Sequence, residues 1–290
     1  MMDTNLIVDS GTTRTDWLVV RGSTVIGSAC TKGLNPYFQS YEDIQKEIEN
    51  VLFHEMKTFS VNNDSIDRVY FYGAGCVFDK VEIMRGAISS CMPACEINVY
   101  SDLLAAAHST CGHEAGIACI LGTGSNSCFY DGNKIVKNIP PLGYILGDEG
   151  GGVMLGRILV GDVLKEILSK PLRDLFFERF HITQADILDH VYKKPFPNRF
   201  LAGFSPFLYE HVNEPEIRLI LVNAFKSFIT RNVMQYDYKE YAVNFAGSIA
   251  YQYKEILEET VESAGIRIGK VIKSPMKGLI DYYNVWRLER

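Results

Sequence analysis

The stretch that sets the architecture of this chain is "LIVDSGTTRTDWLVV", residues 6–20. Two apolar, strand-like runs flank a turn of small and hydroxyl-bearing residues, and a carboxylate, Asp9, stands at the end of the first run. Short apolar runs bounded by turn residues are typical of buried strands. Together with the run that follows, they predict a three-strand meander over residues 5–9, 15–20 and 24–29, whose first turn is polar.

The same order of elements begins again in the middle of the chain. "GIACILGTGSNSCFYDGNKIVKN", residues 116–138, predicts three more strands, with "GTGS" at the first turn and Asp-Gly, a hairpin signal, at the second. Later in each half a strand passes through a small polar turn into a helix, and within residues 241–265 a long helix is predicted after the turn. If two such halves faced one another, both polar turns, near Gly11 and Gly122, would lie on one cleft.

Composition and charge limit the class of protein. The 290 residues are 47% hydrophobic and 22% charged, which is typical of a globular protein with one large domain or two. The formal net charge of -6 gives no electrostatic reason to expect a nucleic-acid or anionic-membrane partner. No apolar run approaches the roughly 18 residues of a membrane span, and the first residues do not resemble a signal peptide. The 7 cysteines have no regular spacing and favour reduced thiols in the cytoplasm.

The first polar turn is a candidate phosphate site. "DSGTTRT", residues 9–15, is neither a Walker A loop nor a dinucleotide fingerprint. Its N–H groups, with the hydroxyls of Thr12 and Thr13, could hold phosphate oxygens, and Asp9 could face a Mg²⁺ bound to them. A polar hairpin stabilised by turn hydrogen bonds is the alternative. A second such turn, "GTGSNS" at residues 122–127, favours a nucleotide triphosphate bound by both turns.

Asp102 lies where a predicted strand passes into an alanine-rich helix, in "YSDLLAAA", residues 100–107. Aspartate is a preferred N-cap there, and this structural role is favoured by composition alone, although a catalytic role does not exclude it. His108, further along the same helix, is better explained as a hydrogen-bonded histidine on a helix face than as a ligand. The histidines show no metal-ligand spacing.

Two glycine-containing stretches follow. In "LGDEGGG", Asp148 and Glu149 stand among glycines that let backbone approach a ligand, and a carboxylate there can accept hydrogen bonds from sugar hydroxyls. A mobile loop with acids at a helix N-terminus is an equally open alternative. In "FAGSIA", Gly247 and Ser248 join a strand to a helix and could touch a flat ligand.

In this order the motifs resemble those of the BadF/BadG-type ATPase family, within the superfamily of sugar kinases, actin and heat-shock chaperones. The closest resemblance is to the N-acetylglucosamine kinases. The motifs that carry it run from Asp9 to Ala250: "DSGTTRT", "GLNPYF", "SDLLAAA", "GTGSNS", "LGDEGGG" and "FAGSIA". The resemblance implies an α/β fold of two ribonuclease-H-like domains, of the actin-like ATPase type, with a central cleft. The domains expected are residues 1–108 and 109–290, with the last helix left open to pack back on the first domain.

The resemblance also implies an activity and a set of site residues. The activity is that of a cytoplasmic, ATP-dependent kinase that phosphorylates a small-molecule sugar, N-acetylglucosamine, at its 6-hydroxyl with the help of Mg²⁺; a homodimer is left open. Asp102 would accept the proton of the sugar hydroxyl, and Asp9 would orient the Mg²⁺ of ATP, through water. The residues around the phosphates would be Gly11, Thr12, Thr13, Gly122, Thr123 and Gly124, and those against adenosine Gly247 and Ser248. The residues that hold the sugar would be Asn35, Ser125, Asn126, Gly143 and Asp148.

Some positions depart from the family pattern. Ser10 and Thr12 stand where glycines are common, and Ala246 stands where a Gly-Gly pair is usual, which lowers the nucleotide affinity that we expect. Two other functions remain open. One is an ATPase that activates a partner reductase or dehydratase through an iron–sulfur cluster, for which only Cys119 and Cys128, at the second turn, are suggestive. The other is a sugar-sensing regulator, which needs a DNA-binding segment that the few residues before Asp9 cannot form.

Overall fold

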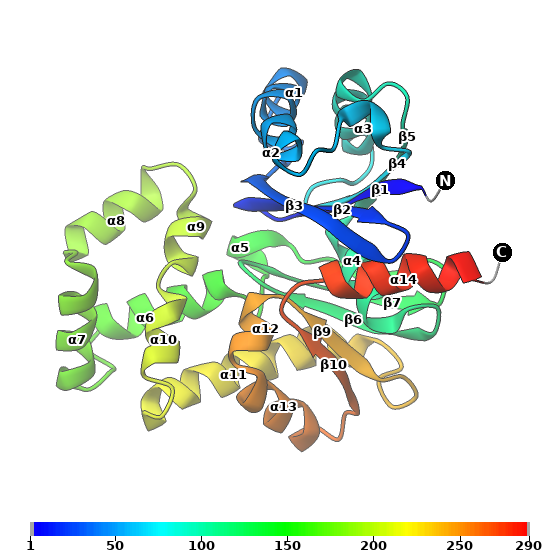
Figure 1. Cartoon of the computed structure of the whole chain (residues 1–290). Helices are drawn as coiled ribbons and strands as arrows, with labels where there is room; N and C mark the ends of the chain where they lie inside the picture. Colours follow the sequence, from blue (N-terminus) through cyan, green and yellow to red (C-terminus); the bar gives the residue numbers. More distant parts are fainter. Residues whose placement is uncertain (1–2, 289–290) are drawn as a thin grey trace. The chain divides into compact units, whose positions relative to one another are not determined.

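The computed structural model describes residues 3–288, which form two compact units (Figure 1). Unit 1 comprises Met1–Glu114, Gly132–Lys134 and Ser274–Arg290, and unit 2 comprises Ala115–Asp131 and Ile135–Lys273. Among the described residues, no helix is long and apolar enough to cross a membrane.

Unit 1 is built on a five-stranded mixed sheet. The predicted meander is confirmed as β1 (Thr4–Ser10), β2 (Arg14–Arg21) and β3 (Thr24–Lys32), which pair antiparallel. β4 (Arg68–Gly73) pairs parallel with β1, and β5 (Glu96–Ser101) pairs parallel with β4, which gives the order β3-β2-β1-β4-β5.

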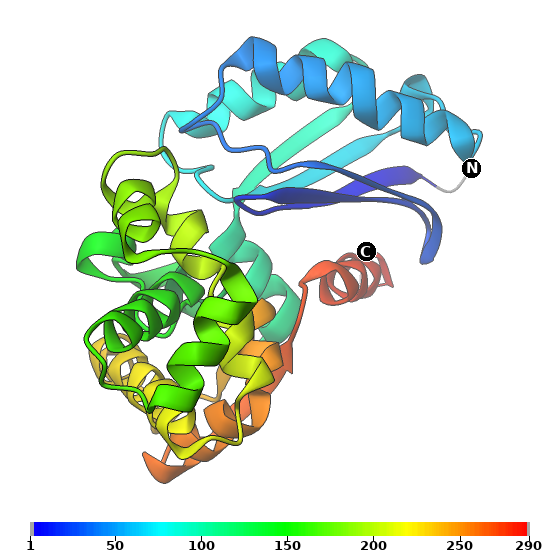
Figure 2. The same ribbon diagram turned by 90° about the vertical axis from the view of Figure 1, so that its left-hand side faces the viewer.

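Both faces of this sheet are covered by helices, as Figures 1 and 2 show. Alternate residues of β1 point to opposite faces, so Leu6 and Val8 enter one core while Ile7 enters another. The first core is formed with α1 (Tyr41–Glu47), the π-helical turn Ile48–Leu52, α2 (Phe53–Thr58) and α3 (Lys80–Cys91). The second is formed with α4 (Asp102–Cys111) and α14 (Met276–Leu288), the last helix of the chain.

Unit 2 repeats the strand connectivity of unit 1. β6 (Ala115–Leu121), β7 (Ser125–Asp131) and β8 (Ile135–Ile139) form a second antiparallel meander. β9 (Val243–Ala246) and β10 (Ile268–Ile272) then join in parallel, which gives the order β10-β9-β6-β7-β8. The repeated order of elements that the sequence predicts is therefore confirmed, and β10 is a strand that the sequence reading did not identify. Two mixed sheets of this kind are the α/β architecture of the actin-like fold.

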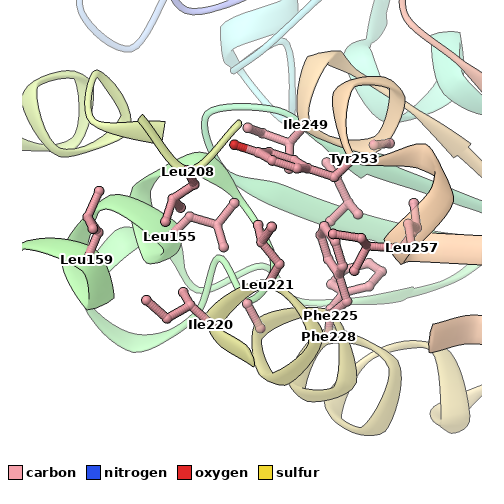
Figure 3. Packing of buried hydrophobic residues seen from close by; sticks show 14 of the residues in the cluster. Leu155, Leu159, Leu208, Ile220, Leu221, Phe225, Phe228, Ile249, Tyr253 and Leu257 are labelled. Atoms are coloured by element: carbon pink, nitrogen blue, oxygen red, sulfur yellow. The ribbon is translucent and has the colours of Figure 1, made fainter. Parts of the chain in front are cut away.

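The core of unit 2 is largely helical. Figure 3 shows side chains from several helices meeting in it, among them Leu155, Leu208 and Phe225. The helices before β9 are α5 (Gly143–Leu146), α6 (Gly152–Leu164), α7 (Lys170–Phe180), α8 (Gln184–Tyr192), α9 (Pro197–Ala202), α10 (Ser205–Glu210) and α11 (Pro215–Arg231), with a 3-10 turn at Val233–Gln235. Between β9 and β10 lie α12 (Ser248–Gln252) and α13 (Lys254–Ser263).

The single long helix predicted after Gly247 is wrong. The helix breaks at Tyr253, which ends α12 and begins α13. Tyr253 is 2% exposed, and its hydroxyl donates a hydrogen bond to the carbonyl oxygen of Ser205 at 2.7 Å. A buried phenol needs such a partner, and the break accompanies the packing of Tyr253 inside the helical core (Figure 3).

Candidate functional site

Three parallel strands of unit 1 end in register. Ser10, at the end of β1, lies opposite Gly73 of β4, and Gly73 lies opposite Ser101 of β5. The residues that follow these strands therefore gather at one edge of the sheet, where α/β proteins commonly bind ligands. This edge carries the first polar turn, the turn that follows Gly73, and Asp102.

The first polar turn is a tight hairpin between β1 and β2. The Gly11 N–H group donates to the Arg14 carbonyl oxygen at 2.9 Å. Gly11 and Thr13 are exposed, while Thr12 is half-buried. The Arg14 guanidinium is held by Asp16, with 2.6 Å between Nε and Oδ1. Gly11 and Thr13 at the tip of the turn are thus accessible, and Arg14 is bound by Asp16 of its own strand.

Asp9 stands among other carboxylates. It pairs in register with Asp16 on β2, and Asp102 acts on it electrostatically. Burial first, then Asp102 and then Asp16, raise the pKa of Asp9 to about 7. Among the described residues, no group of three metal-ligating side chains converges. This donor set fits a divalent cation that one carboxylate orients and that takes its other ligands from water and phosphate.

Asp102 is the first residue of α4 and does not cap it. Ser101 is the N-cap, and its Oγ accepts a hydrogen bond from the Leu104 N–H group at 3.2 Å. The Asp102 Oδ1 accepts the neighbouring Leu103 N–H group at 2.9 Å, and the carboxylate also interacts with the backbone N–H group of Asp102 itself. The N-cap role favoured from composition is therefore wrong. β5 ends at Ser101, and Asp102 is already the first residue of the helix, so the cap position belongs to Ser101. Burial raises the pKa of the Asp102 carboxyl, and the Leu103 hydrogen bond opposes this rise.

Asn35 lies in the loop after β3 and packs next to this edge. Its side chain is 8% exposed, and its Oδ1 accepts the Tyr37 N–H group at 2.9 Å. A Cβ added at Gly75 would lie 2.3 Å from this Oδ1, so the glycine permits the close approach. The Asn35 Nδ2 donates to no other group within residues 3–288 and is available to a ligand.

The second polar turn of unit 2 is built in a similar way. The Gly122 N–H group donates to the Gly124 carbonyl oxygen at 3.0 Å. The start of α6 fastens this turn, because the Gly152 N–H group donates to the Gly122 carbonyl oxygen at 2.8 Å and Val153 donates to Thr123 at 2.9 Å. Thr123 thus lies where the turn meets the helix.

Gly247 approaches the same turn from β9. Its φ is +121°, and a Cβ there would lie 2.3 Å from the Leu121 carbonyl oxygen, so only glycine fits. Ser248, which follows it, is exposed and begins α12. The structure therefore brings the "GTGS" turn and the "FAGSIA" joint together within unit 2.

Asp148 lies directly on the second turn. It has a left-handed backbone with φ of 55°. Its Oδ1 accepts the Ser125 N–H group at 3.0 Å, and a Cβ at Gly124 would lie 2.6 Å from the same oxygen. Burial raises the pKa of Asp148, and the Ser125 hydrogen bond opposes this rise. The second carboxylate oxygen accepts nothing from the described part of the chain, which leaves an acceptor for a ligand.

The other residues predicted to hold the sugar differ in their burial and in their hydrogen bonds. Ser125 is 6% exposed at the start of β7. The Asn126 Oδ1 already accepts the Ser127 N–H group and the Asn138 Nδ2, both at 2.9 Å. Gly143 has a φ of +71° and begins α5, and its carbonyl oxygen accepts the Gly147 N–H group at 2.8 Å. Gly143 is therefore connected to the Asp148 loop through its backbone.

Sequence reasoning missed two interactions near these residues. Cys76 is buried at 2% exposure, and burial and the charge of Asp102 raise its pKa to about 12. The glycines before Cys76 were a signal of a tight turn at this edge. The Glu149 carboxylate is bound by Arg231, with 2.5 Å between Oε1 and Nε, a pairing across 82 positions that no local pattern indicates.

Comparisons with known proteins place the chain among solved structures. No protein-family model and no curated protein matches it. The structure of a putative N-acetylglucosamine kinase from Porphyromonas gingivalis is 43% identical, with a TM-score of 0.93, and the match covers 97% of this chain and 98% of that one. A putative N-acetylglucosamine kinase from Chromobacterium violaceum matches at 16% identity and a TM-score of 0.76, over 97% and 99% of the two chains. The (R)-2-hydroxyglutaryl-CoA dehydratase component A of Acidaminococcus fermentans matches at 11% identity and a TM-score of 0.53, over 99% of this chain and 100% of that one. The last two show the fold alone.

Proposed function

The chain belongs to the N-acetylglucosamine kinase-like branch of the BadF/BadG-type ATPase family, and on this premise we propose that it is an ATP-dependent kinase of an amino sugar. The sugar that we propose is N-acetylglucosamine, phosphorylated at its 6-hydroxyl. The observation that carries the proposal is the state of Asp102: a half-buried carboxylate at the ligand edge of unit 1 that the helix cap does not use.

Asp102 is the general base in this proposal. Burial raises its pKa, which makes the carboxylate a better proton acceptor than an exposed aspartate. It accepts the proton of the sugar hydroxyl as that oxygen attacks the γ-phosphorus of ATP, and the bond from this phosphorus to the β,γ-bridging oxygen breaks to release ADP. In phosphoryl transfer the protein contributes mainly positioning and charge stabilisation, so one well-placed base and several orienting groups suffice.

The nucleotide residues come from the two polar turns. Asp9 orients the Mg²⁺ of ATP, and the ion, when bound, supplies charge stabilisation at the phosphates. The hydroxyls and backbone at the exposed tip of the first turn bind phosphate oxygens, and Gly247 lies against adenosine with Ser248. The turn residues assigned to the phosphates are Gly11, Thr12, Thr13, Gly122, Thr123 and Gly124.

The sugar is held by one amide and one carboxylate of complementary character. The Asn35 Nδ2 donates to a sugar hydroxyl oxygen, and the second Asp148 oxygen accepts from a hydroxyl proton. Ser125, Asn126 and Gly143 complete the assignment for the acetamido group and the remaining hydroxyls. Because these groups are fixed by their own backbone hydrogen bonds, they orient the sugar at a low entropic cost.

A screen of ADP release tests the proposal. We expect release to require both Mg²⁺ and a sugar, and kcat/KM to be highest for N-acetylglucosamine among glucose, glucosamine, N-acetylmannosamine and N-acetylglucosamine. Nuclear magnetic resonance of the product should show the phosphate on the 6-oxygen. ATP hydrolysis at an equal rate with and without every sugar would contradict a sugar kinase.

The activator function is disfavoured by the place of its candidate cysteines. Cys119 and Cys128 lie on the adjacent strands β6 and β7, and both are 0% exposed. A cluster shared between subunits needs thiolates that reach the surface. A protein purified without air should therefore show no broad visible absorption band.

A further inference from the structure

Ser10 stands at a junction of backbone segments in unit 1. Its side chain is 0% exposed, and its Oγ lies 2.7 Å from the Thr15 Oγ1. The Leu34 N–H group donates to both hydroxyls, at 3.0 Å to Ser10 and 3.1 Å to Thr15. The Thr15 hydroxyl in turn donates to the Lys32 carbonyl oxygen at 2.9 Å. Two buried hydroxyls thus fix the chain as it leaves β3.

The Ser10 backbone makes a second connection. Its carbonyl oxygen accepts the Ala74 N–H group at 2.9 Å, and the next residue, Gly75, packs against the Asn35 side chain. The loop that bears Asn35 is therefore held from two sides, by the side chain of Ser10 at Leu34 and by the turn that the Ser10 carbonyl anchors.

The same loop lies against the first polar turn. A Cβ added at Gly33 would lie 2.5 Å from the Gly11 carbonyl oxygen and 2.6 Å from that of Thr12. Backbone contacts this close leave little freedom for one segment to move without the other. Ser10 therefore joins the residues proposed to bind phosphate to the residue proposed to bind sugar.

We propose that Ser10 is a positioning residue that couples nucleotide binding at the Gly11–Thr13 turn to the order of the loop bearing Asn35. The inference rests on the proposed function and assigns a role to a position that departs from the family's glycine. A glycine at this position has no hydroxyl for the Leu34 N–H group, and a buried donor left with one acceptor instead of two is held less firmly. Binding at either end then changes affinity at the other, as linkage requires.

Hydrogen exchange measured by mass spectrometry tests the coupling without knowledge of the sugar. The probe is Mg²⁺ with the non-hydrolysable analogue AMPPNP, added to the full chain at saturation. In the wild type we expect the ligand to slow exchange in residues 33–37 by about fivefold or more. In Ser10→Ala the same segment should exchange faster in the free protein, and the ligand should slow it by less than about twofold.

Thr31→Val is the matched control. Thr31 is buried at 6% exposure, pairs in register with Thr15, and its Oγ1 accepts the Trp17 Nε1–H group at 3.0 Å. The substitution removes a buried hydroxyl and its 3.2 Å hydrogen bond to the Lys32 carbonyl oxygen. It keeps the hydrogen bonds from the Leu34 N–H group to Ser10 and Thr15. It should therefore lower stability somewhat and leave the response of residues 33–37 to the nucleotide as in the wild type.

A kinetic measurement separates positioning from catalysis. Ser10→Ala removes the contacts of this hydroxyl with the Thr15 hydroxyl, the Leu34 N–H group and the Leu34 carbonyl oxygen. It should raise the KM for the sugar about five- to tenfold and change kcat by less than about threefold. In Ser10→Ala, the sugar Kd measured without AMPPNP divided by the sugar Kd measured with it should be closer to one than in the wild type. Thr15→Val, which keeps the shape of the side chain and removes the second hydroxyl, gives the same readouts if Ser10→Ala does not fold.

Each outcome decides something. If AMPPNP protects residues 33–37 equally in the wild type and in Ser10→Ala, Ser10 only stabilises the fold and the inference is overturned. If the nucleotide binds but no sugar is phosphorylated, the proposed function fails while the exchange result still decides the role of Ser10. If the wild type does not bind the nucleotide, both fail.

Discussion

At the start of α4 the Ser101 hydroxyl caps the helix, whereas the Asp102 carboxylate accepts the N–H group of the neighbouring Leu103 and does not serve as the cap. Asp102→Asn should therefore leave the melting temperature near that of the wild type and lower kcat by on the order of 10²–10⁴, because an amide cannot accept the sugar proton. Ser101→Ala should lower the free energy of unfolding by about 1 kcal/mol and keep most of kcat.

Thermal melts and initial rates of both variants test whether Ser101 stabilises the helix and Asp102 serves catalysis. An Asp102→Asn protein that keeps more than about a tenth of the wild-type kcat would remove Asp102 from the mechanism. A Ser101→Ala protein that loses kcat without losing stability would show that the cap assignment is wrong.

The Asp148 loop gives a second prediction for single residues. Glu149, whose side chain is 13% exposed, binds Arg231 and holds this loop against the end of α11. Glu149→Gln should raise the KM for the sugar about three- to tenfold with little change in kcat. The weaker hydrogen bond to Arg231 displaces Asp148, and this reduces sugar binding equally in the ground state and in the transition state. Arg218 lies on α11 like Arg231, and its exposed ion pair is with Glu259 on α13. Arg218→Ala is therefore the control and should change neither the KM nor kcat. An equal rise of KM in both variants would contradict a specific tether.

The sequence predicts the residue types of the site better than their roles. Asp148 was identified because a carboxylate among glycines can accept hydrogen bonds from a sugar, whereas the catalytic role of Asp102 was implied only by the resemblance to the kinase family. The cap was assigned to Asp102 instead of Ser101, because both residue types cap helices and the start of the helix differs by one position. The Glu149–Arg231 pair and the electrostatic effect of Asp102 on Cys76 join distant segments, so only the folded chain reveals them.

At the scale of elements, α4 and α14 pack through an aromatic cluster around His108. The Tyr72 hydroxyl bonds to the His108 Nδ1 at 2.8 Å and to the Tyr283 hydroxyl at 2.6 Å, and the Tyr282 ring stacks on His108 at 3.9 Å. This agrees with the reading of His108 as a hydrogen-bonded helix-face histidine. Burial first, and then His113, lower the pKa of His108 to about 3.

The depressed pKa of His108 predicts a pH dependence of stability. In the unfolded chain His108 becomes protonated below about pH 6.5, whereas in the folded chain it stays neutral down to about pH 3. The free energy of unfolding therefore falls as the pH falls from 6.5 towards 3. His108→Asn should be less stable than the wild type at pH 7.5, and the difference should shrink by about 2 kcal/mol at pH 5. Urea unfolding at both pH values measures it. A difference that is independent of pH would mean that His108 is charged in the folded protein.

The strands of the two meanders could be predicted because each is a short apolar run that ends at a turn signal. The helices α8, α9 and α10 were not predicted, since they are short and their apolar residues pack through aromatic contacts such as Phe200 on His190 instead of following one long stripe. β10 was missed because its pairing with β9 shifts register between Ile268 and Val271, where Gly269 lies against Asn244. Local patterns do not contain such tertiary effects.

At the scale of the whole molecule, the sequence predicted that both halves begin with a three-strand meander and later pass from a strand through a small turn into a helix. The complete strand order of unit 2 was not predicted, because it includes β10. The membership of α14 in unit 1 could not be derived from its position after the last strand of unit 2. It follows from tertiary contacts: a Cβ at Gly278 would lie 2.3 Å from the Ser109 carbonyl oxygen, so α14 approaches α4 at backbone distance.

The proposed function assigns residues of both units to one nucleotide, and this predicts how ligand binding stabilises the protein. Neither polar turn contains a lysine, so the stabilisation by AMPPNP should require Mg²⁺. At a hundred times the Kd, binding adds about 2.7 kcal/mol to the free energy of unfolding and should raise the melting temperature by several degrees.

Two variants test whether both turns bind this nucleotide. Asp9→Asn in unit 1 and Gly124→Ala in unit 2, whose new Cβ would meet the Asp148 carboxylate, should each remove most of the shift in melting temperature. Arg218→Ala should keep it. If each variant instead kept about half of the shift, the two turns would bind separate ligands, and the assignment of one nucleotide to both would be wrong.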